Sequence, residues 1–338
     1  MIVGAVVALL AAGTLLGVAY GQASSKTTSA PTSTTAPLPP VVPDGTYQVS
    51  TATLDAGTTG APAATPGSRL ATTVWFPAAR SPEGGLVPDH ARAPYPLLVF
   101  SQGYKQTPAR YDVLLTAWAS AGFVVAAPTY PHTDDLPPYM NENDIFNHPA
   151  ELRTVVAAVL ALARSPGSAL SGLVKASEIG LVGQSDGGDV SLAVAANTCC
   201  RLPGVKAVAV LSGAELKGLD GTYFAAPTPP LLVVQDNADT VNIPACSAQI
   251  YDDAPPPKWY LGLLGAANLK TAHLTPYVHR NPYETVVAQV TTDFFDATLA
   301  GQTPALRAMG RDGDVPGVAQ LSDGATVPVL PTGCPGAP

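Results

Sequence analysis

The stretch GQSDG at residues 183–187 could place a nucleophilic serine on a sharp turn. It follows an apolar run at 178–184 and precedes a helical pattern at 187–198. A G-x-S-x-G motif between a strand and a helix exposes its serine on a strained turn, for which the glycines leave room. A chance Gly-Ser-Gly loop in a glycine-rich chain is the alternative. The strand-to-helix context favours Ser185 as the nucleophile of an acyl-transfer reaction.

Alternating strands and helices must position this serine. Continuous apolar runs predict strands of a parallel sheet that is covered on both faces; they lie at residues 96–100, 122–128, 178–184, 205–211, 230–235 and 258–264. Helical patterns occupy residues 109–121, 149–165, 187–198 and 281–301, and alternating runs at 46–54 and 69–77 predict an opening antiparallel hairpin. This order predicts a doubly wound α/β domain that binds ligands at the carboxyl ends of its strands.

The last helical pattern carries its own start and stop signals. Asn281 can cap the helix, Pro282 fits its first turn, and Glu284 completes a capping box. Gly301 is then expected to end the helix.

With Ser185 in this setting, the chain resembles enzymes of the α/β-hydrolase fold. Among them it resembles the secreted dienelactone-hydrolase-like, platelet-activating-factor-acetylhydrolase-like and cutinase-like serine esterases, over about residues 45–300. Residues 94–131 resemble their oxyanion segment, and LLVVQDNADTVNIP at 231–244 resembles their acid turn. The resemblance implies an α/β-hydrolase fold with a mostly parallel central sheet, helices on both faces, and no cofactor.

The resemblance also implies a histidine base after the last strand. His273 lies in GAANLKTAHLTPY, which resembles the family's Gly-Ala-x-His-Leu-x-Pro segment. His279 is the alternative, although it directly precedes the helix cap. Alignment by loop length alone would instead put Asn268 at the base position, and the protein would then be a catalytically inactive binding protein.

An acid must hold the imidazole in the correct tautomer. Asp236 and Asp239 both follow the strand at 230–235, and the family pattern aligns with Asp239. The resulting chain order of Ser185, Asp239 and His273 is the order expected of this fold.

The oxyanion hole is expected to use two backbone N–H groups. One belongs to Asp186, directly after the nucleophile, and the other to Tyr104 in the loop after residues 96–100. Gln102 stands where many relatives carry histidine. The Asp186 carboxylate is a second departure, because it would repel an oxyanion unless it points away or is paired. It could slow the chemistry or disfavour anionic substrates.

Two residues after residues 122–128 are candidates for substrate contact. Tyr130 and His132 lie in PTYPHTDD near the expected cleft, with a solvated loop as the alternative. His132, Asp134 and Asp135 lack the spacing of metal ligands, and no CxxC occurs, so we expect neither a metal nor a cofactor.

The N-terminal part of the sequence divides into two segments. Residues 1–22 contain an uncharged apolar run and are expected to be either a cleaved signal peptide or a retained membrane anchor. Residues 23–43 are rich in Ser, Thr and Pro and are expected to be a disordered linker. The hydrolase domain then covers 44–301, and a Gly- and Pro-rich tail from 302 to 338 is expected to wrap the surface. Either reading places the domain outside the cytoplasm.

Cys199, Cys200, Cys246 and Cys334 are expected to form two disulfides in an exported protein. Because adjacent cysteines rarely bond to each other, we expect Cys199 and Cys200 each to pair with one of the other two. Cys334 would then pin the C-terminal tail.

Composition limits the partners. Only 12% of residues are charged and the net charge is −8, with no basic run, so nucleic acid is not an expected ligand. The connections at 131–149 and 212–229 are too short for a cap domain, which predicts an open cleft for bulky or lipidic esters. We therefore expect a monomeric, secreted or membrane-anchored carboxylesterase that touches a membrane only through its N-terminal segment. An envelope acyltransferase with the same triad is the alternative.

Overall fold

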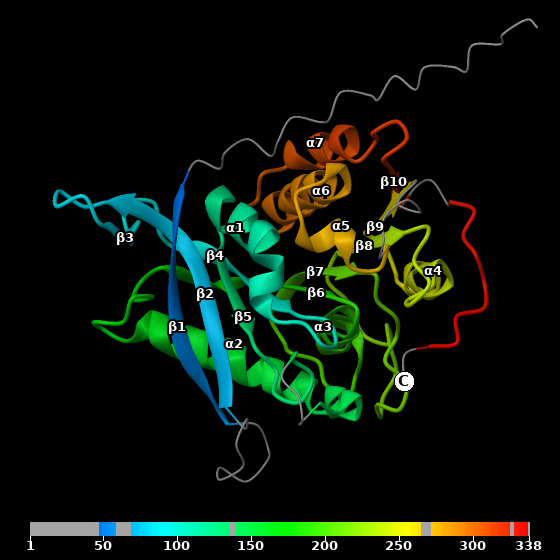
Figure 1. The fold of residues 1–338 in the computed structure, drawn as a ribbon, viewed down its shortest axis with the longest axis horizontal. Coiled ribbons are helices and arrows are strands. Elements are labelled where there is room, and N and C mark those ends of the chain that lie inside the picture. Colours follow the sequence, from blue (N-terminus) through cyan, green and yellow to red (C-terminus); the bar gives the residue numbers. More distant parts are fainter. Residues whose placement is uncertain (1–46, 59–68, 136–139, 265–271, 325–327, 337–338) are drawn as a thin grey trace, which may run out of the picture. The chain divides into compact units, whose positions relative to one another are not determined.

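A mixed ten-stranded sheet forms the centre of the computed structural model, which describes residues 47–58, 69–135, 140–264, 272–324 and 328–336 (Figure 1). The strand order is β1-β2-β5-β4-β6-β7-β8-β9-β10, and β3 pairs with β2 outside this path. The strands are β1 (Gln48–Thr58), β2 (Arg69–Arg80), β3 (Leu86–Pro88), β4 (Tyr95–Ser101), β5 (Val124–Pro128), β6 (Val174–Gln184), β7 (Val205–Leu211), β8 (Leu231–Asp236), β9 (Lys258–Leu263) and β10 (Ala319–Asp323).

The six strands from β4 to β9 run parallel, as their continuous apolar sequences predict. The sheet is not parallel throughout, however. The β1–β2 hairpin joins β5 in antiparallel pairing on one side, and β10 pairs antiparallel with β9 on the other. The parallel strands bring their carboxyl ends to one edge of the sheet, where the residues after β4, β6, β8 and β9 gather.

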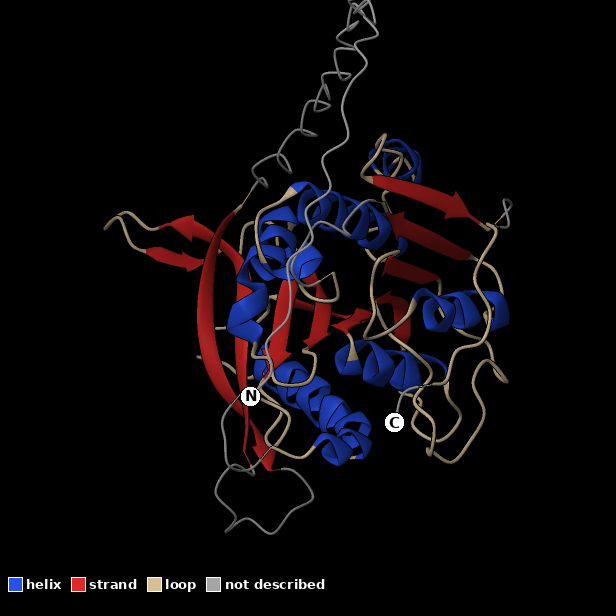
Figure 2. Cartoon of the chain, turned by 45° about the vertical axis from the view of Figure 1, so that its right-hand side comes forward, coloured by secondary structure: helices blue, strands red, loops and turns tan. Residues whose placement is uncertain are grey.

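Helices cover both faces of the sheet (Figure 2). α2 (His148–Arg164), α3 (Asp186–Ala196) and α4 (Pro244–Asp253) pack on one face. The other face carries α1 (Asp112–Ala121), α5 (Thr275–Val278), α6 (Pro282–Thr298) and α7 (Ala305–Asp312). Short 3-10 segments, η1 (Pro108–Tyr111) and η2 (Glu142–Phe146), precede α1 and α2.

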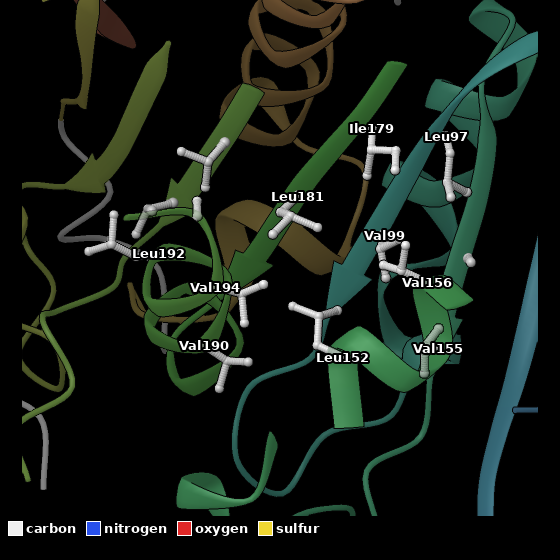
Figure 3. Packing of buried hydrophobic residues seen from close by; sticks show 14 of the residues in the cluster. Leu97, Val99, Leu152, Val155, Val156, Ile179, Leu181, Val190, Leu192 and Val194 are labelled. Carbon is white, nitrogen blue, oxygen red and sulfur yellow. The ribbon is translucent and has the colours of Figure 1, made fainter. Parts of the chain in front are cut away.

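Alternate residues of each central strand face opposite cores. In β4, Leu97 and Val99 contribute to the core under α2 and α3, whereas Leu98 and Phe100 contribute to the core under α1 and α6. Figure 3 shows the first core, in which side chains of α2 and α3 point toward β4 and β6. Burial on both faces explains why these strands read as unbroken apolar runs.

The start of α6 follows its predicted cap. The side-chain oxygen of Asn281 accepts hydrogen bonds from the backbone N–H groups of Tyr283 (2.9 Å) and Glu284 (3.0 Å). Pro282 occupies the first turn, where its missing N–H costs nothing. The helix ends at Thr298, and Gly301 follows with φ +72.

Residues after 301 contain regular structure that the Gly- and Pro-rich sequence did not predict. α7 packs against α6, and β10 extends the sheet beyond β9. The segment after β10 is fixed through Cys334, which forms a disulfide with Cys246 of α4, as the tail was predicted to be pinned.

The predicted pairing is wrong for all four cysteines, because Cys199 and Cys200 form a disulfide with each other instead of each pairing with Cys246 or Cys334. They lie in a tight turn after α3, in which the N–H of Cys199 donates to the side chain of Asn197 at 3.0 Å. Cys246 is buried, and its Cα lies 4.5 Å from that of Cys334, with which it forms the second disulfide. Cys199 and Cys200 are then the remaining two cysteines.

Several sequence predictions fall on parts of the chain outside the described residues. These are the apolar N-terminal run, the linker up to residue 43, and Asn268. Within the residues that the structure describes, no helix is long and apolar enough to cross a membrane.

Candidate active site

Ser185 lies between the last residue of β6 and the first residue of α3, with φ 55 and ψ −130. This is a sparsely populated backbone conformation for a residue with a side chain, and such strain is held only by tight surroundings. A Cβ atom on Gly183 would lie 2.0 Å from the carbonyl oxygen of Gly187, and one on Gly187 would lie 2.0 Å from that of Ser101. Glycine is therefore required at both positions, and together they hold the serine at the tip of a sharp turn.

Asp239 and His273 meet beside this turn. The Nδ1 atom of His273 lies 2.8 Å from Oδ2 of Asp239, which follows β8 and is almost fully buried. The other carboxylate oxygen of Asp239 accepts the N–H of Val241 at 2.9 Å. Because a carboxylate can only accept, His273 donates from Nδ1, which leaves Nε2 free to take a proton.

The alternative acid and base lie elsewhere. Asp236 accepts the N–H of Ala238 at 2.8 Å, and burial raises the pKa of its carboxyl to about 6. His279 is exposed at the end of α5. Of the two candidate acids and two candidate bases, the structure brings Asp239 and His273 together.

A side chain that sequence reasoning did not single out, Gln184, contacts the candidate base His273. Its amide nitrogen donates to the carbonyl oxygen of His273 at 3.0 Å and lies 3.3 Å from Nε2. Its amide oxygen accepts from Tyr111 at 2.8 Å, and the N–H of Gly103 reaches the Tyr111 hydroxyl at 3.3 Å. Gln184 directly precedes the candidate nucleophile, so its position in the sequence could have predicted a role in the site. No sequence pattern linked Tyr111 to the site.

The hydroxyl of Ser185 is not hydrogen-bonded to His273 among the contacts of the described residues. The Gln184 amide faces Nε2 instead. Catalytic hydrogen bonds often form only when substrate is bound.

The two proposed oxyanion donors come from separate elements that meet at the serine. Asp186 begins α3, so its N–H lacks a helical partner. Tyr104 follows β4, and its neighbour Gly103 is so close to the serine that an added Cβ would lie 3.1 Å from Cβ of Ser185. Gln102 is buried, and its amide atoms have no hydrogen-bond partner among the described residues.

The side-chain carboxyl of Asp186 interacts with the backbone N–H of the same residue. It is only 7% exposed. Burial raises its pKa to about 6, and the negative charge of Glu142 acts in the same direction. His273, the N–H of Asp186 itself and the Ser185 side chain oppose the shift. A carboxyl group that titrates near neutral pH therefore adjoins the candidate nucleophile.

Tyr130 packs against other protein side chains, and its predicted contact with substrate stays a prediction. Its side chain is fully buried, its hydroxyl lies 2.9 Å from Oγ of Ser101, and its ring stacks on His148 at 4.2 Å. These partners hold its side chain between the last residue of β4 and the first residue of α2. His132 is partly exposed and lies 3.3 Å from Asp144, and its contact with substrate stays a prediction.

Within the described part of the chain, no group of three or more His, Cys, Asp or Glu side chains is placed to hold a metal ion. A cavity of about 700 Å³ lies on the α4 face of the sheet, near the acid-bearing turn. Its lining includes Asn237, Ile243, Tyr260 and Leu330, and none of the three triad candidates.

The fold, the serine turn and the Asp239–His273 pair define a protein of the α/β-hydrolase superfamily of serine esterases. A family model described as Chlorophyllase matches residues 77–247, about half of the chain. The chain belongs to this chlorophyllase family, which is a family of ester-hydrolysing serine hydrolases. The matched range includes Ser185 and Asp239, and His273 lies beyond it. A search of curated proteins found no match.

Proposed function

We propose that the protein is an extracytoplasmic serine hydrolase that cleaves carboxylic esters with Ser185, His273 and Asp239. The observation that carries this proposal is the 2.8 Å contact between Nδ1 of His273 and the buried carboxylate of Asp239, beside a serine held on a strained turn. Membership of an ester-hydrolysing family supports the reaction class.

The proposed reaction has two steps. Nε2 of His273 takes the proton of Ser185 as its oxygen attacks the ester carbonyl, and the N–H groups of Asp186 and Tyr104 stabilise the oxyanion. His273 then protonates the leaving alcohol, and an acyl-enzyme remains. Water attacks this acyl-enzyme, again with His273 as base, and releases the acid.

Two further features support the location and the kind of substrate. Disulfides persist in oxidising compartments, and the described residues contain two of them. The connection between β7 and β8, at residues 212–230, contains no helix, so it adds no cap over the serine from this side. An open site would accept esters with bulky alcohol or acyl groups.

Labelling with a fluorophosphonate probe tests this function. We expect the full chain to form one covalent adduct, located on Ser185 by mass spectrometry, because the probe reacts with an activated serine. Ser185→Ala should remove the adduct, and His273→Ala should slow it by at least about 10³ because the general base is lost.

His279→Ala provides the matched control for this experiment. His279 is exposed and lies two residues before Asn281, the cap of α6, so its loss should leave the labelling rate nearly unchanged. An intact chain that forms no adduct would contradict the proposed function. Equal loss of labelling in His279→Ala would contradict the assignment of the base.

A further inference from the structure

Asp186 presents an unusual group to any substrate at Ser185. Its carboxyl is buried beside the nucleophile, and its Oδ2 atom has no hydrogen-bond partner among the described residues. Buried carboxyl oxygens are normally paired, because loss of hydration without a new partner is costly. When ionised, the Asp186 carboxyl therefore places a negative charge next to Ser185 that no hydrogen bond to Oδ2 offsets, and in a buried setting such a charge acts on nearby groups without direct contact.

We infer that Asp186 makes the enzyme selective for esters that carry a positive charge a few bonds from the scissile carbonyl. This inference rests on the proposed function of Ser185. It names the class of substrate that the same site would prefer.

The charges around Asp186 support this preference. Glu142 of η2 and Asp189 of α3 both interact with it and are acidic, and Tyr111 before α1 is a buried neutral phenol. His273 is the group in its surroundings that can carry positive charge, and it must be neutral when it acts as the base. With His273 neutral, none of the described groups that shift the pKa of Asp186 is a cation.

The position of the carboxyl gives this charge a direct effect on the reaction. Asp186 interacts with its own backbone N–H and with the Ser185 side chain. The same N–H is the proposed oxyanion donor, so an ionised carboxylate competes with the developing oxyanion and repels it. A cationic group on the substrate would pair with the carboxylate and reduce this repulsion at the moment of reaction.

A neutral ester lacks such a cation and needs Asp186 in its protonated form. The pKa of Asp186 is raised to about 6, so its carboxyl is neutral below this pH and ionised above it. Hydrolysis of neutral esters should therefore weaken relative to that of cationic esters as the pH rises through 6. Both reactions use the same base, so its contribution cancels when their ratio is taken at each pH.

Two pairs of isosteric esters test the inference, because their members differ in charge and hardly in shape. Butyrylcholine is compared with 3,3-dimethylbutyl butyrate, and the p-nitrophenyl ester of 4-(trimethylammonio)butyrate with that of 5,5-dimethylhexanoate. Quaternary ammonium groups do not titrate. At about pH 8 we expect kcat/KM to favour the cationic member of at least one pair by about tenfold or more. Near pH 5 this preference should shrink.

Asp186→Asn should bring the preference to within about threefold of unity, mainly by raising the rate with the neutral ester. Glu142→Gln is the matched control, because Glu142 is exposed and acts on Asp186 only through its charge. It should change the preference less than Asp186→Asn does. If Asp186→Asn does not fold, the pH dependence of the wild-type ratio still tests the inference.

Ratios near unity for both pairs at pH 8, or a preference that survives in Asp186→Asn, would overturn the inference. Where turnover is too slow to measure, each ester is instead tested for protection of Ser185 from the fluorophosphonate, and equal protection within both pairs has the same meaning. Failure of the proposed function looks different. In that case Ser185→Ala hydrolyses the esters as fast as the wild type, or the intact chain forms no adduct.

Discussion

Asp239→Asn is expected to lower kcat by about 10⁴ without disturbing the fold. Oδ1 of an asparagine at this position can still accept the N–H of Val241, as the carboxylate does at 2.9 Å. Its amide NH₂ group would then face Nδ1 of His273 and force that nitrogen to accept. Nε2 would carry the proton and could no longer act as a base toward Ser185. Steady-state hydrolysis of an activated ester, with a thermal melt of the same sample, measures both parts of the prediction.

Asp236→Asn is the control, since it changes a buried carboxyl in the same turn. Asp236 accepts the N–H of Ala238 and does not face His273. We expect its kcat to stay within about fivefold of the wild type, because a group outside the triad affects the rate only through structure. The opposite result, in which Asp236→Asn loses activity and Asp239→Asn retains it, would move the acid to Asp236.

Gly187→Ala is expected to destabilise the protein by about 3 kcal/mol or more, at the upper end of the cost of overpacking. Its Cβ would lie 2.0 Å from the carbonyl oxygen of Ser101 and 2.6 Å from that of Gln102. Both obstacles are backbone atoms at the end of β4, so neither can rotate away. The serine turn and the oxyanion loop would have to separate. Denaturant unfolding monitored by fluorescence gives the change in the free energy of unfolding.

Gly310→Ala supplies a comparison in which the same side-chain atom is added to a site with space. Gly310 lies within α7, and an added Cβ meets nothing within 4 Å outside the helix backbone. Alanine at an interior helix position should raise the free energy of unfolding by about 0.5–1 kcal/mol. If both variants shifted stability equally, the close contact at Gly187 would not be the cause.

Much of the site follows from local sequence. A strand, two glycines and a helix within one short stretch predict the serine turn. The chain order of serine, acid and base is the order expected of the α/β-hydrolase fold. The central strands are recognisable because burial on both faces demands apolar side chains at every position. The structure then places the carboxylate of Asp239 against the imidazole of His273, a contact that the sequence left open between two acids and two histidines.

Other features depend on contacts that have no local signature. Tyr111 and Gln184 are 73 positions apart in the chain, and no local sequence pattern predicts that they form a hydrogen bond. Tyr130 follows a central strand, where substrate-contacting residues are expected, but its side chain is buried against Ser101 and His148. Disulfide pairing likewise depends on which cysteines the fold brings together. The short elements α7 and β10 are stabilised by packing against α6 and pairing with β9, which their own sequences do not indicate.

The placement of β10 makes this border of the sheet a poorer template for self-association. β9 would otherwise form the outer border of the sheet, and an unpaired border strand offers a template to which another chain can add. β10 replaces β9 at that border with a strand of only five residues, among them Gln320, Ser322 and Asp323, and a short polar strand is a weaker template. The Cys246–Cys334 disulfide ties the residues after β10 to α4. If a protease cut the chain between α7 and β10, the protecting strand would remain covalently attached. Under oxidising conditions a nicked molecule therefore keeps its border covered, whereas reduction of the same molecule would free the strand and open a route to aggregation.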